Sequence, residues 1–250
     1  MKMRKLFALT LMELKKMIRE PAYLFLMLLF PAALTLTFGL GFSEIESAIP
    51  GKNQFELMVP GLYAYACIFI IMTVAQTFTD DRETGLLKRI NLTPTTSSEF
   101  MGSHLVSNTI LSMLQVAIVA LTSFLIGYRS EAHLIGISLS FVFIAILSIC
   151  SVGLGLITAT ISKNSGTATG LAFIFILPQM FFGTFIPITS TTQIIAMVLP
   201  SYYVTESITK ILSGTVLTDI SIWSNLAIVS IFSIIIVIAG ILIFKKYGKT

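Results

Sequence analysis

Residues 220–244 read ISIWSNLAIVSIFSIIIVIAGILIF, a stretch without Asp, Glu, Lys or Arg. A helix needs about 20 predominantly apolar residues to cross the hydrocarbon core of a bilayer. The segment 231–243 is rich in β-branched residues, which favour strands in water. In lipid, however, the backbone must satisfy its own hydrogen bonds, so the stretch predicts a transmembrane helix.

The composition indicates that the rest of the chain is also in lipid. Of its 250 residues, 55% are hydrophobic and 11% are charged, whereas a soluble domain has about 25% charged residues. This excludes a water-soluble globular protein. Two Cys are too few for a disulfide framework, and no zinc, haem or iron–sulfur motif occurs, so cysteine usage does not indicate a redox compartment.

Five further charge-free runs divide the chain, at 21–43, 57–79, 105–128, 134–162 and 164–205. The last of these is long enough for one span plus another element, but after Pro187 its only continuous apolar piece, 194–199, is too short to cross. We therefore expect one all-α integral membrane domain, 1–250, with six transmembrane helices and an extracellular re-entrant region at 187–221. The expected spans cover about 22–42, 57–79, 105–128, 134–161, 166–186 and 222–244.

The distribution of basic residues predicts the orientation. Of the 16 Lys and Arg, all but Lys52, Arg129 and Lys210 fall on one side of the six-span arrangement. Basic residues near span ends are retained in the cytoplasm, so we expect both termini to be cytoplasmic. A seventh span would place Lys245 and Lys246 outside.

Residues 1–20 have an amphipathic helical pattern. The apolar face comprises Met3, Leu6, Phe7, Leu11, Leu14, Met17 and Ile18, and the basic face Arg4, Lys5, Lys15, Lys16 and Arg19. Such a helix lies on the inner membrane surface and contacts lipid; a positive-inside anchor with no further role is the alternative. The apolar run that follows is too long for a signal-peptide core, so we expect the segment to be retained.

The segment 80–103 is the only sizeable cytoplasmic loop in this topology. Acidic residues at 80, 81 and 83, basic residues at 88 and 89, and Pro94 predict a short helix with its acids at the start. Thr96 and Glu99 then predict a capping box that begins the next helix. The short helix could transmit the movement of a soluble partner to the membrane domain, or it could be a capped connecting helix with no such role.

This loop carries a resemblance to a known family. Residues 81–94, DRETGLLKRINLTP, are similar to the loop of ABC-2 type transporter permeases, roughly E-R-E-x-G-T-L-E-R-L with T-P a few residues later. The matching positions are Glu83, Gly85, Leu87, Arg89, Thr93 and Pro94, whereas Leu86 and Lys88 depart from the pattern. The resemblance extends to the basic N-terminal helix, the six spans and the stretches at 177–187 and 199–203.

The resemblance implies a multi-pass permease subunit of an exporter in the cell membrane. Because no charge lies within the expected spans, we expect apolar and hydroxyl groups to line its path, which suits an amphiphilic or hydrophobic substrate such as a drug, an antibiotic or a lipid. The resemblance also implies a separate ABC ATP-binding subunit that carries the ATP and magnesium, and a second permease copy or paralogue. We expect no cofactor, metal or catalytic residue on this chain and no nucleic-acid partner. The phosphate-binding pattern G-x-x-x-x-G-K-[ST] is absent, and 165–170 lacks the Lys.

The same resemblance implies which residues couple the chain to its ATPase. They are Asp81, Glu83, Gly85, Leu86, Leu87, Arg89, Ile90 and Pro94. We expect Glu83 to lie at a helix start, where the dipole favours a carboxylate, and Gly85 to permit close approach of another backbone. The apolar residues would fill the groove at the interface.

Related permeases form their path from spans two and five, which implies a set of lining residues. They are Met58, Tyr63, Tyr65, Met72, Thr73, Gln76, Phe173, Phe175, Gln179, Met180 and Phe182. Each could instead be a core or lipid-facing residue. Gly166 and Gly170 form a G-x-x-x-G step for close helix approach, which we expect within the bundle rather than between subunits.

Three other classes compete with an ABC permease. An intramembrane hydrolase is the least favoured, because no G-x-S-x-G elbow occurs and His104 and His133 fall on opposite sides of the membrane. A secondary carrier or channel is disfavoured, since no ionisable carboxylate, the usual marker of a proton- or sodium-coupled carrier, lies inside any expected span. A non-transporting membrane scaffold is the third alternative.

Overall fold

The computed structural model describes residues 2–47, 49–86, 89, 92, 95–186 and 189–247, without the side chains of 2, 3, 22, 23, 26 and 97. It is all-helical, and no strand occurs in these residues. The longer helices are α1 (Lys2–Arg19), α2 (Pro21–Phe42), α3 (Gln54–Glu83), α5 (Ser97–Ile126), α6 (Leu134–Ile161), α7 (Ser165–Met180) and α10 (Ile220–Tyr247). The shorter ones are the π-helix η1 (Phe181–Phe185), α8 (Ser190–Ala196) and α9 (Pro200–Leu212).

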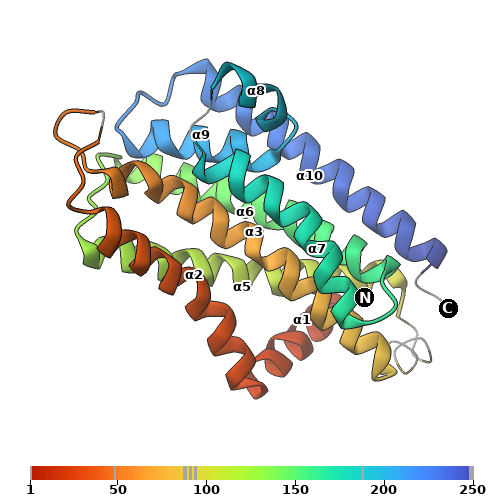
Figure 1. Ribbon diagram of the computed structural model, residues 1–250. Helices are drawn as coiled ribbons and strands as arrows, with labels where there is room; N and C mark the ends of the chain where they lie inside the picture. The colour runs from red at the N-terminus through yellow and green to blue at the C-terminus, as the bar shows by residue number, and fades with distance from the viewer. Residues whose placement is uncertain are drawn as a thin grey trace.

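Helix α3 is the central element of the bundle. It packs against α2, α5, α6, α7 and α9 (Figure 1), and most of its side chains between Val59 and Phe78 are buried. The approach of α6 is close because Gly155 has no side chain: a Cβ there would lie 2.8 Å from the carbonyl oxygen of Ile71. A sequence apolar all round its helix, as in α3, is typical of a buried helix.

In the part of the chain that the structure describes, five helices are long and apolar enough to cross a membrane: α3, α5, α6, α7 with η1, and α10. The apolar part of α2, Met27–Phe42, is shorter. These helices confirm a multi-pass membrane protein, and the predicted boundaries of 134–161 agree with α6. Helix α3 extends beyond the predicted span 57–79, since it continues through charged residues as far as Glu83.

Helices α1 and α2 form a V whose vertex is at Pro21 (Figure 1). Pro21 is tolerated there because the first residue of a helix needs no intrahelical N–H bond. Helix α1 packs against α5 and buries Thr10, Glu13 and Met17. Its expected single apolar face is divided: Met17 packs inward, whereas Phe7 and Ile18 are exposed.

The two termini lie at one end of the bundle, which we call the terminal end; α8 and the loop between α2 and α3 lie toward the other, the far end (Figure 1). At the terminal end Met17, Phe78, Phe100 and Phe244 join α1, α3, α5 and α10 in one apolar cluster.

The predicted re-entrant region contains two helices, α8 and α9. Helix α9 packs against α3, α6 and α10 and buries Val204, Ile208 and Ile211 in the largest apolar cluster. The expected short apolar piece at 194–199 is divided between the end of α8 and the turn before α9. Pro187, where we expected this region to begin, is outside the described residues.

Candidate functional site

The candidate coupling residues begin at the terminal end of α3. Asp80, Asp81 and Glu83 end this helix, so the prediction that they start a new one is wrong. The chain has no break between the apolar run and these acids, and the helix ends only where Thr84 and Gly85 form a turn. Glu83 is therefore at a helix C-terminus, where the dipole disfavours a carboxylate.

Gly85 allows the chain to turn at the end of α3. Its φ of +75° lies in the left-handed region that favours glycine, and a Cβ there would have no described atom within 4 Å. It therefore permits the turn after α3, and the close approach of a partner's backbone stays a prediction. The capping box predicted for Thr96 and Glu99 is confirmed at the start of α5.

The remaining coupling candidates differ in exposure. Glu83 and Arg89 are exposed, whereas Leu86 is half-buried against the apolar cluster that contains Phe78 and Phe100. Leu87, Ile90 and Pro94 lie outside the described residues. Glu83 and Arg89 are thus the candidates whose side chains the structure offers to a partner.

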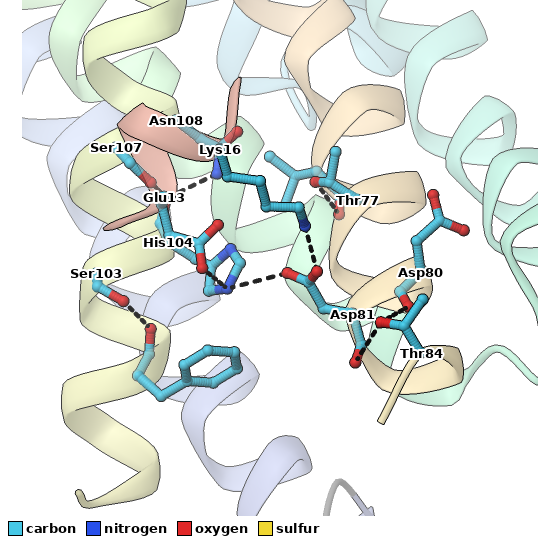
Figure 2. Close-up of polar contacts among 12 residues, drawn as sticks. Glu13, Lys16, Thr77, Asp80, Asp81, Thr84, Ser103, His104, Ser107 and Asn108 are labelled. Atoms are coloured by element: carbon cyan, nitrogen blue, oxygen red, sulfur yellow. Dashed lines mark hydrogen bonds and ion pairs between the residues drawn. The ribbon is translucent and has the colours of Figure 1, made fainter. Parts of the chain in front are cut away.

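Asp81 is buried inside the chain, with 3% of its surface exposed. It forms an ion pair with Lys16 of α1 (Figure 2). Its other carboxylate oxygen faces His104 of α5, 3.9 Å from Nε2, and Glu13 of α1 lies 3.4 Å from the same nitrogen. Burial, and then the Asp81 carboxylate, raise the pKa of Glu13 to about 7.

This cluster joins α1, α3 and α5 and was not predicted from the sequence. Its residues are up to 91 positions apart in the sequence, from Glu13 to His104. One signal was available: Glu13 is an acid next to the apolar stripe of an otherwise basic helix. Asp81 therefore connects α3 to α1 and is not itself at the surface.

Arg82 is a second connection that the sequence analysis missed. Its guanidinium Nη1 donates hydrogen bonds to the carbonyl oxygens of Ala159 (2.7 Å), Thr160 (3.0 Å) and Ser162 (3.3 Å). These groups end α6, and a helix leaves its last four carbonyls without an intrahelical partner. Arg82 satisfies them and ties the end of α3 to α6.

The candidate path residues divide into several environments. Tyr65, Met72 and Met180 meet in one apolar cluster with Met27 and Phe69. Thr73 and Gln76 hydrogen-bond to Met27 of α2 and Thr169 of α7, at 2.7 and 2.8 Å. Phe175 packs near Met72 in an adjacent cluster. This part of the set lies where α2, α3 and α7 meet.

The other path candidates do not converge there. Tyr63 packs in the large cluster with Val119 and Phe143, and Phe173 is 41% exposed. Gln179 is buried, and Phe182 is half-buried. Met58 lines a pocket at the far end, described below.

An aromatic row follows the α2–α3 contact. Phe30 stacks on Phe69 with ring centroids 4.8 Å apart, Phe69 contacts Tyr65 at 6.1 Å, and Tyr65 contacts Phe185 at 5.7 Å. Phe38 stacks on Phe185 at 5.4 Å. The sequence analysis did not include α2, although Phe30 and Phe38 recur on one helix face.

The row ends at a pocket of about 540 Å³. Phe185 lines this pocket together with Met58, Thr184, Tyr202, Glu206 and Lys210. Glu206 and Lys210 form an ion pair of 2.9 Å on adjacent turns of α9. The pocket thus combines apolar walls with one charge of each sign.

The G-x-x-x-G step of α7 is not used inside the bundle. A Cβ on Gly170 would have no described atom within 4 Å, and one on Gly166 would meet only a side-chain atom of Asn164. The expected packing within the bundle is therefore wrong. Phe173, Ile174 and Leu177, which follow on α7, are also exposed.

The comparisons with known proteins give one family. A family model described as ABC-2 type transporter matches residues 4–213, well over half of the chain. The comparison with curated proteins gives no match.

Proposed function

The chain belongs to the ABC-2 type transporter family, a family of membrane permeases of ABC transporters, and from this premise we propose its detailed function. It is the permease subunit that pairs with a second copy or paralogue and exports an amphiphilic or hydrophobic substrate. A separate ATP-binding subunit hydrolyses ATP with magnesium. The family match carries this proposal.

The proposed orientation has six spans, including α2, with the terminal end in the cytoplasm. The ATPase then docks at the exposed side chains of Glu83 and Arg89. Three connections at the end of α3 support a coupling role for this segment. Asp81 pairs with Lys16 of α1, Arg82 bonds to the end of α6, and Leu86 packs on the terminal apolar cluster. Movement of this segment would thus reach α1, α3 and α6 together.

The proposed substrate path follows the aromatic row to the far-end pocket. Aromatic and Met side chains provide apolar contact area, and the Glu206–Lys210 pair offers hydrogen bonds to a polar head group. This combination suits an amphiphile. The exposed face of α7 around Gly170 is the proposed contact with the second permease, since small residues let helices approach closely in membranes.

The test uses the permease reconstituted in vesicles with its ATPase. We expect Glu83→Lys to preserve insertion and assembly but to lower substrate-stimulated ATP hydrolysis and transport at least about tenfold, a loss of about 1.4 kcal/mol of coupling. The matched control is Glu44→Lys, the same charge change at an exposed site in the α2–α3 loop. It should behave as wild type.

Two results would contradict the proposal. Transport by the purified chain without any ATPase would indicate a secondary carrier or channel. Equal activity of wild type and Glu83→Lys in an assembled complex would remove the coupling role from this segment.

A further inference from the structure

Three helices place an imidazole and two carboxylates in one buried cluster at the terminal end. Glu13 of α1 is 2% exposed, Asp81 of α3 is 3% exposed, and His104 of α5 is 1% exposed. One ligand atom from each lies within 4.8 Å of the others. Figure 2 shows the three side chains pointing toward one another, with Lys16 reaching Asp81 from α1.

The atoms that face each other have no hydrogen-bond partner among the described residues. They are Oε1 of Glu13, Oδ2 of Asp81 and Nε2 of His104. Lys16 bonds to the other oxygen of Asp81, Oδ1, and leaves Oδ2 directed at His104. Buried polar atoms without a partner are costly, and buried charges are normally paired or bind a metal.

The donor set and its spacing match a zinc site. Zinc binds His nitrogen and Asp or Glu oxygen at about 2.0–2.2 Å in tetrahedral geometry, which places neighbouring donors about 3.4 Å apart. The Nε2 atom of His104 is 3.4 Å from Oε1 of Glu13 and 3.9 Å from Oδ2 of Asp81. A set of three donors that includes nitrogen does not suit magnesium or calcium, which take six or more oxygens.

We propose that Glu13, Asp81 and His104 bind a zinc ion that fastens the N-terminal helix α1 to α3 and α5. A water completes the tetrahedron. The ligands are far apart in sequence, so the ion closes long loops of the chain. The site is separate from the exposed residues assigned to the ATPase contact and does not depend on the proposed transport function.

The surroundings of the cluster support this assignment. The His104 ring packs edge-on against both Phe78 and Phe100, with centroids 5.0 and 4.6 Å away, which restricts its orientation. With His104 neutral and both carboxylates deprotonated, as metal binding requires, the two carboxylates and Lys16 carry a net charge of −1. A divalent cation offsets that charge, and Lys16 competes with it for Asp81.

The test measures metal bound by the full chain, purified in detergent without a polyhistidine tag and treated with a chelator. Titration with zinc chloride should give one tightly bound ion per chain, and cobalt chloride should give the visible absorption of tetrahedral cobalt. His104→Ala should abolish zinc binding and the cobalt absorption, or weaken the metal affinity more than about 100-fold. Changing a residue that only hydrogen-bonds to a ligand already lowers metal affinity 10–100-fold. His133→Ala, which changes the other histidine of the chain at an exposed position, is the matched control and should bind as wild type.

Two more variants keep the test decisive. Glu13→Gln nearly preserves the side-chain shape and should also lose zinc, so a misfolded His104→Ala protein would not decide the outcome. Lys16→Met removes the competing cation and should retain one ion per chain with tighter binding. A role of these residues in ion pairing alone predicts no metal in any variant.

The proposal is overturned if wild type takes up no more zinc than Glu13→Gln and His104→Ala, in which case the cluster holds a shared proton. It is equally overturned if His133→Ala, and not His104→Ala, removes the metal. Neither result would affect the proposed permease function, which is measured by transport.

Discussion

Three neighbouring residues at the end of α3 have three different environments. Asp81 is buried and pairs with Lys16, Arg82 bonds to the end of α6, and Glu83 is exposed. Successive residues of a helix are about 100° apart, so each points to a different neighbour. A substitution at each position therefore tests a different property of the protein.

Arg82→Gln should lower the free energy of unfolding in detergent by about 1.5–3 kcal/mol, the contribution of hydrogen bonds to a charged group. It leaves the last carbonyls of α6 without their donor. The matched control is Arg129→Gln, because Arg129 also bonds to two carbonyl oxygens, of Phe124 and Tyr128, but at an exposed position. Its effect should stay below about 1 kcal/mol. Equal effects would show that Arg82 does not hold α6.

At the scale of elements, Gly155 allows α3 and α6 to approach closely. Because a Cβ at Gly155 would lie 2.8 Å from a backbone oxygen of α3, the two helices must separate to accommodate any larger residue. A helix backbone yields less easily than a side chain. Like the ion pair of Asp81 and the hydrogen bonds of Arg82, this contact holds α3 against a neighbouring helix.

Gly155→Ala should destabilise the protein by about 1–3 kcal/mol, as overpacking does in well-packed cores. Gly41→Ala is the control on another helix: a Cβ there has no described atom within 4 Å, and Ala should stabilise α2 by about 0.5–1 kcal/mol. In thermal unfolding of the two purified variants, the midpoint should fall for Gly155→Ala and rise for Gly41→Ala. A stabilising Gly155→Ala would mean that α3 and α6 pack less closely than the structure has them.

At the scale of the whole molecule, orientation is the main prediction. We expect a cysteine at position 246 to be inaccessible to an impermeant reagent in intact cells, and one at position 129 to be labelled from outside. Background labelling should be low, because Cys67 and Cys150 are both buried. Labelling at position 246 from outside would contradict the six-span arrangement.

The sequence by itself determined the membrane class, the helical character of the apolar runs and the capping box of α5. These properties follow from local quantities: the absence of charge over about 20 residues, and a side chain bonded to a backbone group three residues away. The resemblance at 81–94 also predicted the family that the comparisons confirm. None of these depends on how the helices pack.

Only the tertiary structure decided where α3 ends and which side chains meet there. The charge-free run ends at Thr79, yet Asp81 and Arg82 continue the helix, where Lys16 and the end of α6 pair with them. The convergence of Glu13 and His104 likewise requires α1 to fold back beside α5 at Pro21. Such pairings depend on the angle and rotation of packed helices, which no local pattern specifies.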